Sequence, residues 1–161
     1  MYQSHEFYLR RCIEISKDSR AHGNAPFGAL LVDKDGNILI EQENIEITEK
    51  VCTGHAEATL AARASHEYSK AFLRDCTLYT TAEPCAMCAG AIYWANICRV
   101  VYGMTERRLL ELTGSNEQNP HVRPAVPQRL RMRPEKDRGR GTLPRGRGRG
   151  CRRARGLLGL A

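Results

Sequence analysis

The chain has 161 residues, of which 42% are hydrophobic and 27% charged, enough to bury the core of one domain without disulfide support. The sequence contains no run of 18 apolar residues and no charged-then-apolar leader. It therefore favours neither a membrane span nor a secretory signal, and we expect a cytoplasmic protein. Its seven cysteines, an odd number, are typical of reduced thiols rather than of a paired disulfide framework.

Charge divides the chain into two parts near Pro120. Residues 1–120 carry 12 Lys and Arg against 16 Asp and Glu, a net charge of −4, whereas residues 121–161 carry 13 against 2, a net charge of +11. We therefore predict one folded domain over residues 1–120 and a basic tail rich in Arg, Gly and Pro over residues 121–161. Because such a composition buries too little apolar surface to order itself, we expect the tail to be disordered.

The predicted elements alternate between helix and strand. Apolar residues at helical spacing predict a helix over residues 4–22, and the β-rich runs 27–32 and 37–44 flank an Asp-Gly turn, which predicts an antiparallel hairpin. Composition then predicts, in chain order, a helix over 55–64, a strand over 76–82, a helix over 84–95, a strand over 98–103 and a helix over 105–114. The last two strands are joined through a helix and should be parallel, so the fold class is α/β, a three-layer α/β/α sandwich around a central mixed sheet.

The residues that can carry chemistry fall at the starts of two predicted helices. Cys85 and Cys88 lie one helical turn apart behind Pro84, so both sulfurs can bind one ion. His55 opens the other helix, and Glu57 follows two residues later. Zinc prefers thiolate and imidazole ligands, and catalytic zinc sites use three protein ligands. A His-x-Glu motif followed by Pro-Cys-x-x-Cys is the signature of zinc deaminases of nucleobases, in which the Glu moves protons and does not bind the metal.

Two other interpretations of Cys-x-x-Cys are a structural zinc site and a redox pair. A structural zinc site needs four ligands, and the sequence offers no second Cys-x-x-Cys and no clustered His pair. The redox interpretation leaves the neighbouring His-Ala-Glu unexplained. We therefore expect one catalytic Zn²⁺ per chain, which lowers the pKa of a bound water, with Glu57 carrying protons from that water to the base and to the departing amine.

The strings "HAEATL" and "TAEPCAMCAGAIYWA" resemble motifs of the cytidine-deaminase-fold superfamily, in the branch that contains bacterial guanine deaminases and tRNA adenosine deaminases. The likeness extends from about Ser4 to Pro120. It implies a zinc ion held by His55, Cys85 and Cys88, with Glu57 as proton shuttle, and usually a homodimer.

The same resemblance implies contacts with the substrate. Asn44 would hydrogen-bond the base, the backbone N–H of Ala56 would contact its carbonyl, and Phe27 and Trp94 would line the base pocket. Simpler interpretations remain open at this stage, because Asn44 also suits the turn that ends a strand and the two aromatic residues could belong to the core.

The strings "PFGA" and "GAIYWA" favour guanine deaminases, so we predict hydrolysis of guanine, a small-molecule purine, to xanthine and ammonia. One alternative is a tRNA adenosine-to-inosine deaminase, which would need a basic surface for the phosphate backbone. The other is an inactive zinc-containing RNA-binding protein that uses the basic tail. The intact Glu57 argues against the latter, and we favour neither nucleic acid nor a membrane as partner.

The tail departs from the resemblance. Related small-base deaminases continue into a folded segment at this point, whereas this chain turns into Arg, Gly and Pro. The codons for residues 121–141, read one nucleotide downstream, can spell TFDLPCRNVFACGQKKIEVVG, which resembles that segment. We interpret the tail as the product of a frameshift close to Pro120, and we expect its presence to weaken activity while leaving zinc binding intact.

Overall fold

The computed structural model describes residues 3–114 and 155–156. Within these ranges no helix has both the length and the apolar character needed to cross a bilayer. The elements, in chain order, are α1 His5–Ala21, β1 Gly28–Val32, β2 Ile38–Glu43, α2 Ala56–Glu67, α3 Lys70–Leu73, β3 Thr77–Ala82, α4 Ala86–Trp94, β4 Arg99–Met104, α5 Glu106–Thr113 and β5 Arg155–Gly156.

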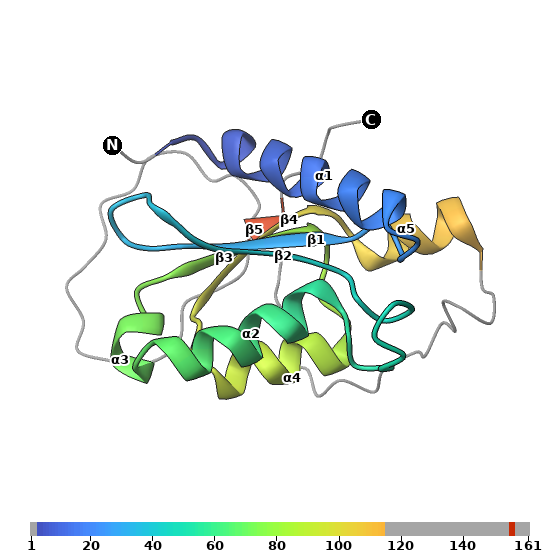
Figure 1. The fold of residues 1–161 in the computed structure, drawn as a ribbon. Coiled ribbons are helices and arrows are strands. Elements are labelled where there is room, and N and C mark those ends of the chain that lie inside the picture. The colour runs from blue at the N-terminus through green and yellow to red at the C-terminus, as the bar shows by residue number, and fades with distance from the viewer. Residues whose placement is uncertain (1–2, 115–154, 157–161) are drawn as a thin grey trace.

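One mixed sheet forms the middle layer, with strand order β2-β1-β3-β4-β5. Strand β1 pairs antiparallel with both β2 and β3, whereas β3 and β4 are parallel. Helix α1 covers one face of the sheet, and α2 and α4 lie side by side on the other face (Figure 1). The predicted α/β/α sandwich with parallel β3 and β4 is confirmed.

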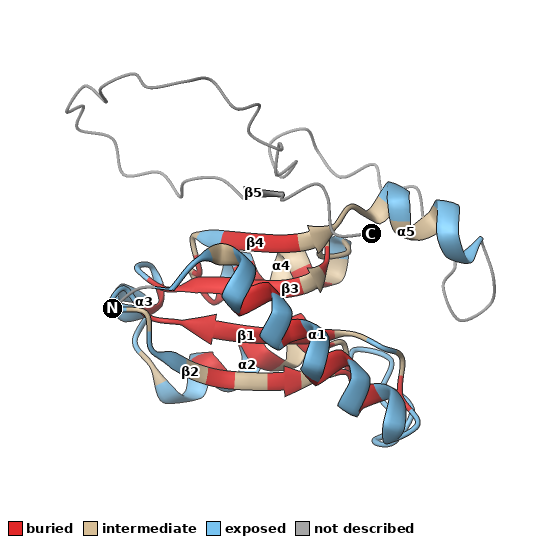
Figure 2. Ribbon diagram, turned by 90° about the horizontal axis from the view of Figure 1, so that it is seen from above, coloured by how far each residue is buried: buried red, intermediate tan, exposed pale blue. Residues whose placement is uncertain are grey.

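The side chains of β1 alternate between two hydrophobic clusters, one on each face of the sheet. Leu30 and Val32 pack beneath α1 with buried residues such as Tyr8 and Tyr79, whereas Ala29 and Leu31 face α2 and α4. All five residues of β1 are buried (Figure 2), as expected for a central strand covered on both faces. The sheet is therefore packed on both faces, and the loops that leave the ends of its strands start from fixed positions.

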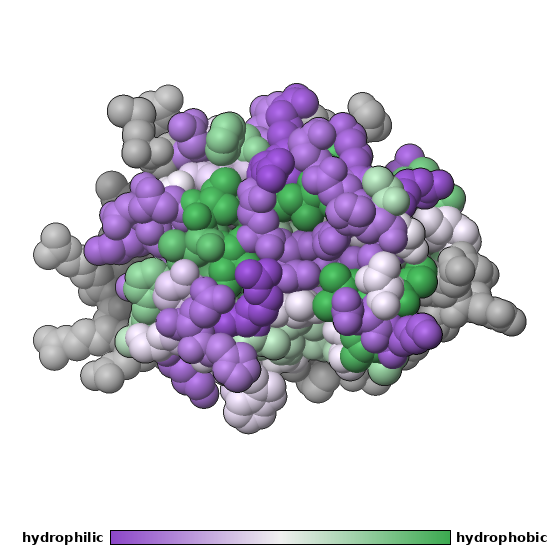
Figure 3. Space-filling model, viewed as in Figure 1, coloured by the Kyte–Doolittle hydropathy of each residue, from purple (hydrophilic) through white to green (hydrophobic). Residues whose placement is uncertain are grey.

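Helix α1 approaches the sheet closely because β1 begins with a glycine. A Cβ on Gly28 would lie 2.6 Å from the carbonyl oxygen of Cys12 and 2.9 Å from Cβ of Ile15. The outer surface of α1 is polar: hydrophilic residues predominate over this helix, and hydrophobic ones gather lower down, at the level of the sheet (Figure 3). This division matches the single buried face of an amphipathic helix.

The predicted hairpin is also confirmed. The chain turns at Gly36, whose φ of +93° suits glycine. The carboxylate of Asp33 accepts hydrogen bonds from the backbone N–H groups of Asp35 and Asn37 and from Nδ2 of Asn37, each at 2.8 Å. These bonds hold the turn that sets the register between β1 and β2.

Two short elements were not predicted. Helix α3 is a single turn that begins after Ser69, whose Oγ accepts a hydrogen bond from the N–H of Phe72 at 3.2 Å. The backbone of β5 pairs parallel with β4. The prediction of a disordered tail over 121–161 concerns residues that lie outside the described part, apart from the two residues of β5.

Candidate active site

One edge of the sheet brings the predicted site residues together. Asn44 follows the C-terminal end of β2, and Phe27 precedes the N-terminal end of β1, so the antiparallel pairing places them next to each other. The N–H of Asn44 donates to the carbonyl oxygen of Phe27 at 3.1 Å. Strand β3 ends at the same edge, three residues before Cys85. Loops at one sheet edge thus supply the site, as is common in α/β folds.

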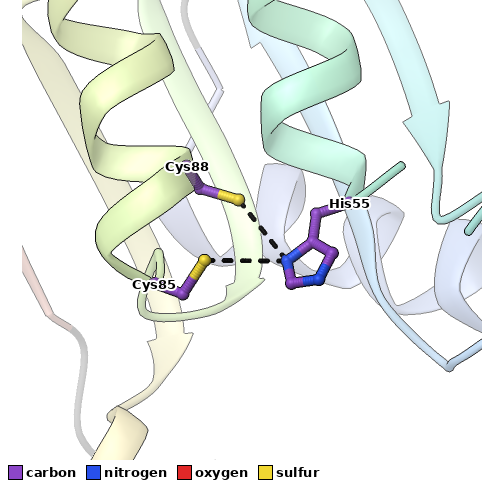
Figure 4. A group of neighbouring side chains, drawn as sticks. All are labelled: His55, Cys85 and Cys88. Atoms are coloured by element: carbon purple, nitrogen blue, oxygen red, sulfur yellow. Dashed lines mark hydrogen bonds between the residues drawn. The ribbon is translucent and has the colours of Figure 1, made fainter. Parts of the chain in front are cut away.

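The three predicted zinc ligands lie in one cluster. His55 caps the N-terminus of α2, and Cys85 caps the N-terminus of α4, with Cys88 one turn further along. Figure 4 shows both sulfur atoms facing the same nitrogen of His55, and each Sγ lies 3.6 Å from Nδ1. Among residues 3–114 this is the one group of three or more His, Cys, Asp or Glu side chains whose ligand atoms converge in this way.

The spacing of these atoms fits a zinc ion. With Zn–S bonds of about 2.3 Å and Zn–N bonds of about 2.05 Å, tetrahedral angles place a sulfur and a nitrogen ligand about 3.6 Å apart. Both Sγ–Nδ1 distances have this value. The donor set of one imidazole and two thiols is the one that zinc prefers, and three protein ligands leave a fourth coordination position. His55, Cys85 and Cys88 therefore have the donor set and the spacing of a three-ligand zinc site.

The electrostatics of the cluster favour metal binding. The interaction with the Cys88 thiol, more than that with His55, holds the pKa of Cys85 well below its usual range. The interaction with Cys85 and burial raise the pKa of Cys88, while the contact with Cys85 raises the pKa of His55. A metal binds cysteine as the thiolate and histidine as the neutral imidazole. The lowered pKa of Cys85 therefore favours binding, and the raised pKa values of Cys88 and His55 mean that binding releases protons.

Glu57 lies beside this cluster and is only 5% exposed. Its Oε1 accepts a hydrogen bond from the Thr80 hydroxyl at 2.9 Å, and its Oε2 accepts one from the Cys88 thiol at 3.5 Å. Burial raises the pKa of Glu57, and the hydrogen bond from Thr80 opposes this shift. A carboxylate fixed in this way can take up and return a proton next to the zinc ligands.

Asn44 and Ala56 both present an unused donor at this edge. Asn44 is 1% exposed, and its Oδ1 accepts the N–H of Glu46 at 2.9 Å, which leaves its Nδ2 without a hydrogen-bond acceptor in the described part. No side-chain nitrogen or oxygen of the described residues is both fully buried and unpaired, so Nδ2 is not fully enclosed by the protein. The N–H of Ala56 is in the first turn of α2, where no intrahelical acceptor exists.

The two predicted aromatic pocket residues differ. Phe27 is half-buried and lies at the site edge next to Asn44, so its predicted contact with the base stays a prediction. Trp94 is 73% exposed and ends α4, nine residues beyond Cys85, about 13 Å along the helix axis. The structure therefore does not bring Trp94 to the site formed by this chain.

The sequence interpretation missed two residues that contact the site. Thr80 donates to Glu57 from the middle of β3, and Glu46 places its Oε2 3.8 Å from Nε2 of His55. Strand alternation could have identified Thr80 as an inward-facing polar residue on a buried strand. Glu46 belongs to the irregular loop between β2 and α2, and no pattern in the sequence signals its position.

Comparison with known proteins agrees with this geometry. "Probable cytosine deaminase" of Schizosaccharomyces pombe is 36% identical over 113 residues, which cover 70% of this chain and 68% of the relative. "Guanine deaminase" of Bacillus subtilis is 42% identical over 100 residues, or 62% of this chain and 64% of the relative. "tRNA-specific adenosine deaminase" of Haemophilus influenzae is 38% identical over 101 residues, or 63% and 58%. The matches thus span about two thirds or less of these relatives' lengths.

A crystal structure of guanine deaminase from Bacillus subtilis matches with a TM-score of 0.61 and 32% identity, over 80% of this chain and 90% of that one. The sequence pattern described as "Cytidine and deoxycytidylate deaminase zinc-binding region" matches residues 2–104, more than half of the chain. This stretch contains the whole His55, Cys85 and Cys88 cluster. The chain therefore belongs to the family of cytidine and deoxycytidylate deaminases with this zinc-binding region, and its cofactor is zinc.

Proposed function

We propose that the protein is a hydrolytic deaminase of a nucleobase or nucleoside. The observation that carries this proposal is the buried carboxylate of Glu57 beside a three-ligand zinc site. A structural zinc site is closed by four ligands and has no use for an adjacent proton carrier. The zinc supplies Lewis acidity that lowers the pKa of a water toward neutrality.

The described residues have distinct roles in this reaction. Glu57 takes one proton from the attacking water and delivers it to the ring nitrogen as the oxygen adds to the ring carbon. It then takes the second proton from the hydroxyl group so formed and delivers it to the amine, which leaves as ammonia when the C–N bond breaks. The hydrogen bond from Thr80 holds Oε1 of Glu57 in place during these transfers. Nδ2 of Asn44 and the N–H of Ala56 donate to acceptor atoms on the base and orient it. Phe27 packs against the base.

Guanine is the substrate that we propose. The Bacillus subtilis relative named guanine deaminase is 42% identical, and its structure aligns with 80% of this chain. Residues 3–114 carry 12 Lys and Arg against 15 Asp and Glu, and Glu46 lies at the zinc cluster. This charge opposes the phosphate backbone that a tRNA substrate brings. Two unused donors, Nδ2 of Asn44 and the N–H of Ala56, suit the ring-nitrogen and carbonyl acceptors of guanine.

Ammonia release from a substrate panel tests this proposal. The full chain, loaded with zinc, is assayed with guanine, cytosine and an adenosine-containing tRNA anticodon stem-loop. We expect guanine to give the highest kcat/KM. A higher value for cytosine or for the stem-loop would overturn guanine as the substrate. Absence of ammonia from all three, together with salt-sensitive RNA binding, would favour the inactive RNA-binding alternative.

We further propose that residues 121–161 replace, through a frameshift near Pro120, a segment that helps to close the pocket. Two observations support this interpretation. The composition changes near Pro120, and the codons for residues 121–141, read one nucleotide downstream, can encode a segment that resembles one in related deaminases. The panel should therefore include a version of the protein with the restored reading frame, which we expect to bind zinc equally and to release ammonia faster. If the gene contains no single-base change that restores this frame, the frameshift interpretation is wrong.

We also propose a homodimer in which α4 contributes to the interface. Tyr93 and Trp94 are 61% and 73% exposed, and their rings contact each other edge to face at 5.4 Å between centroids. Large exposed aromatic residues of this kind are typical of interfaces between proteins. Sedimentation equilibrium should give a dimer that Trp94→Ala weakens, whereas a monomer at all concentrations would contradict the proposal.

A further inference from the structure

The zinc-ligand cluster defines which nitrogen of His55 binds the metal. Nδ1 lies 3.6 Å from both thiol sulfurs, so this atom faces the ion. A neutral imidazole that binds a metal through Nδ1 carries its proton on Nε2. The Nε2–H group therefore points away from the metal and needs an acceptor if the ring is to keep this tautomer and orientation.

The carboxylate of Glu46 faces this outer nitrogen. Its Oε2 lies 3.8 Å from Nε2 of His55, within the range of an ion pair and slightly longer than a hydrogen bond. The Glu46 side chain has no other hydrogen bond or ion pair with the described residues. The Glu46 side chain is 37% exposed and its Oε2 lies 3.8 Å from Nε2, so a hydrogen bond requires the two atoms to approach by less than about 1 Å.

The loop fixes the backbone of Glu46 against the residue that precedes His55. The N–H of Glu46 donates to Oδ1 of Asn44 at 2.9 Å, and its carbonyl oxygen accepts from the N–H of Val51 at 3.0 Å. The neighbouring N–H of Ile45 donates to the carbonyl oxygen of Gly54 at 2.8 Å. A Cβ on Gly54 would lie only 2.9 Å from both N and Cα of Glu46, so glycine permits this close approach.

We infer that Glu46 is a positioning residue for the zinc ligand: its carboxylate accepts the Nε2–H of His55 and holds Nδ1 toward Cys85 and Cys88. The Asn44 side chain, which is proposed to bind the base, anchors the backbone of the same residue. One loop therefore connects the substrate contact to the metal ligand. This role concerns zinc binding and holds whichever base is the substrate.

Zinc affinity of the full chain, measured by competition with a chromophoric chelator, tests the inference. Removing an outer partner of a metal-binding His typically lowers affinity 10- to 100-fold. Both side chains here are about a third exposed, at 35% and 37%, so Glu46→Ala should raise the zinc Kd by about tenfold, at the lower end of this range. Glu46→Gln keeps an acceptor oxygen but loses the charge, and it should raise the Kd by only about threefold.

Two further measurements distinguish a positioning role of Glu46 from a mere loss of negative charge or of stability. Glu49→Gln removes the same charge from an exposed position in the same loop, and it should leave the zinc Kd unchanged. The metal-free variants should unfold at the wild-type temperature, while Co²⁺-substituted Glu46→Ala should show a shifted visible absorption band because the imidazole is reoriented. The inference is overturned if Glu46→Ala binds zinc as tightly as wild type, if Glu49→Gln weakens binding equally, or if the metal-free Glu46 variants are destabilised.

Discussion

Replacing Glu57 by Gln removes the proposed proton carrier while preserving its shape. The Gln oxygen can still accept the hydrogen bond from Thr80, which is 2.9 Å long in the wild type. The amide nitrogen then faces Cys88, where it can donate to the zinc-bound sulfur. Because a neutral amide costs less to bury than a carboxylate, we expect the variant to fold and to bind one zinc ion.

The size of the effect follows from the burial of Glu57. Proton transfer by a positioned side chain contributes about 10²- to 10⁴-fold to a rate. Glu57 is only 5% exposed, so bulk water has little access to replace it, and the same carboxylate serves several proton transfers. We therefore expect kcat to fall by about 10³- to 10⁴-fold, which corresponds to about 4–5.5 kcal/mol in the activation free energy.

The assay is ammonia release at saturating base, with zinc content measured on the same samples. Glu67→Gln is the matched control, because it makes the same change at the exposed C-terminal end of the same helix. We expect the control to retain full activity. The reasoning is refuted if Glu57→Gln carries a full zinc complement and retains more than about a tenth of the wild-type kcat.

Three other changes test the substrate contact and the fold. Asn44→Asp keeps the oxygen that accepts the N–H of Glu46 but removes the proposed donor to the base, so kcat/KM for the base should fall about 10- to 100-fold at unchanged zinc content; unaltered kinetics would contradict this contact. Gly28→Ala should lower the free energy of unfolding by about 1–3 kcal/mol, because its Cβ would overlap the Cys12 carbonyl of α1, and an unchanged melting temperature would count against this packing. Burial raises the pKa of Asp33, but the hydrogen bonds from Asn37, Asp35 and Gly36 outweigh it and leave the pKa lowered. The stabilisation from Asp33 is therefore present above the carboxyl's unfolded pKa of about 3.9 and is lost as the pH falls through the lower folded value. Denaturant titrations of wild type and Asp33→Asn should therefore differ at pH 7, and the difference should shrink as the pH falls below about 3.9.

The zinc cluster could be predicted from the sequence because its parts are local. Cys85 and Cys88 are three residues apart, and His55 and Glu57 are two apart, so each pair is placed by one helix start. The sheet then brings the two helix starts to one edge, because β2 and β3 both pair antiparallel with β1 and therefore end on the same side. Likewise, the Asp-Gly turn was sufficient to predict the hairpin.

The features that were missed depend on contacts between distant or irregular segments. Glu46 meets His55 because the loop folds back on Gly54, and loop conformations of this kind follow no periodic pattern. Trp94 resembles a pocket residue through the local string around it. Its 73% exposure depends on which segments pack against the end of α4, and a local string does not contain that information. Helix α3 has only four residues, too few for a helical repeat to be recognised.

The most direct test of the account is ammonia release from guanine as a function of bound zinc. The full chain is stripped with a chelator, reloaded stepwise with Zn²⁺, and assayed at each step beside Cys88→Ala. We predict activity that rises in proportion to bound zinc up to one ion per chain and that is absent from Cys88→Ala. Ammonia release that persists after zinc removal would contradict the central claim, as would a chain that binds one zinc ion and deaminates no base, nucleoside or tRNA substrate.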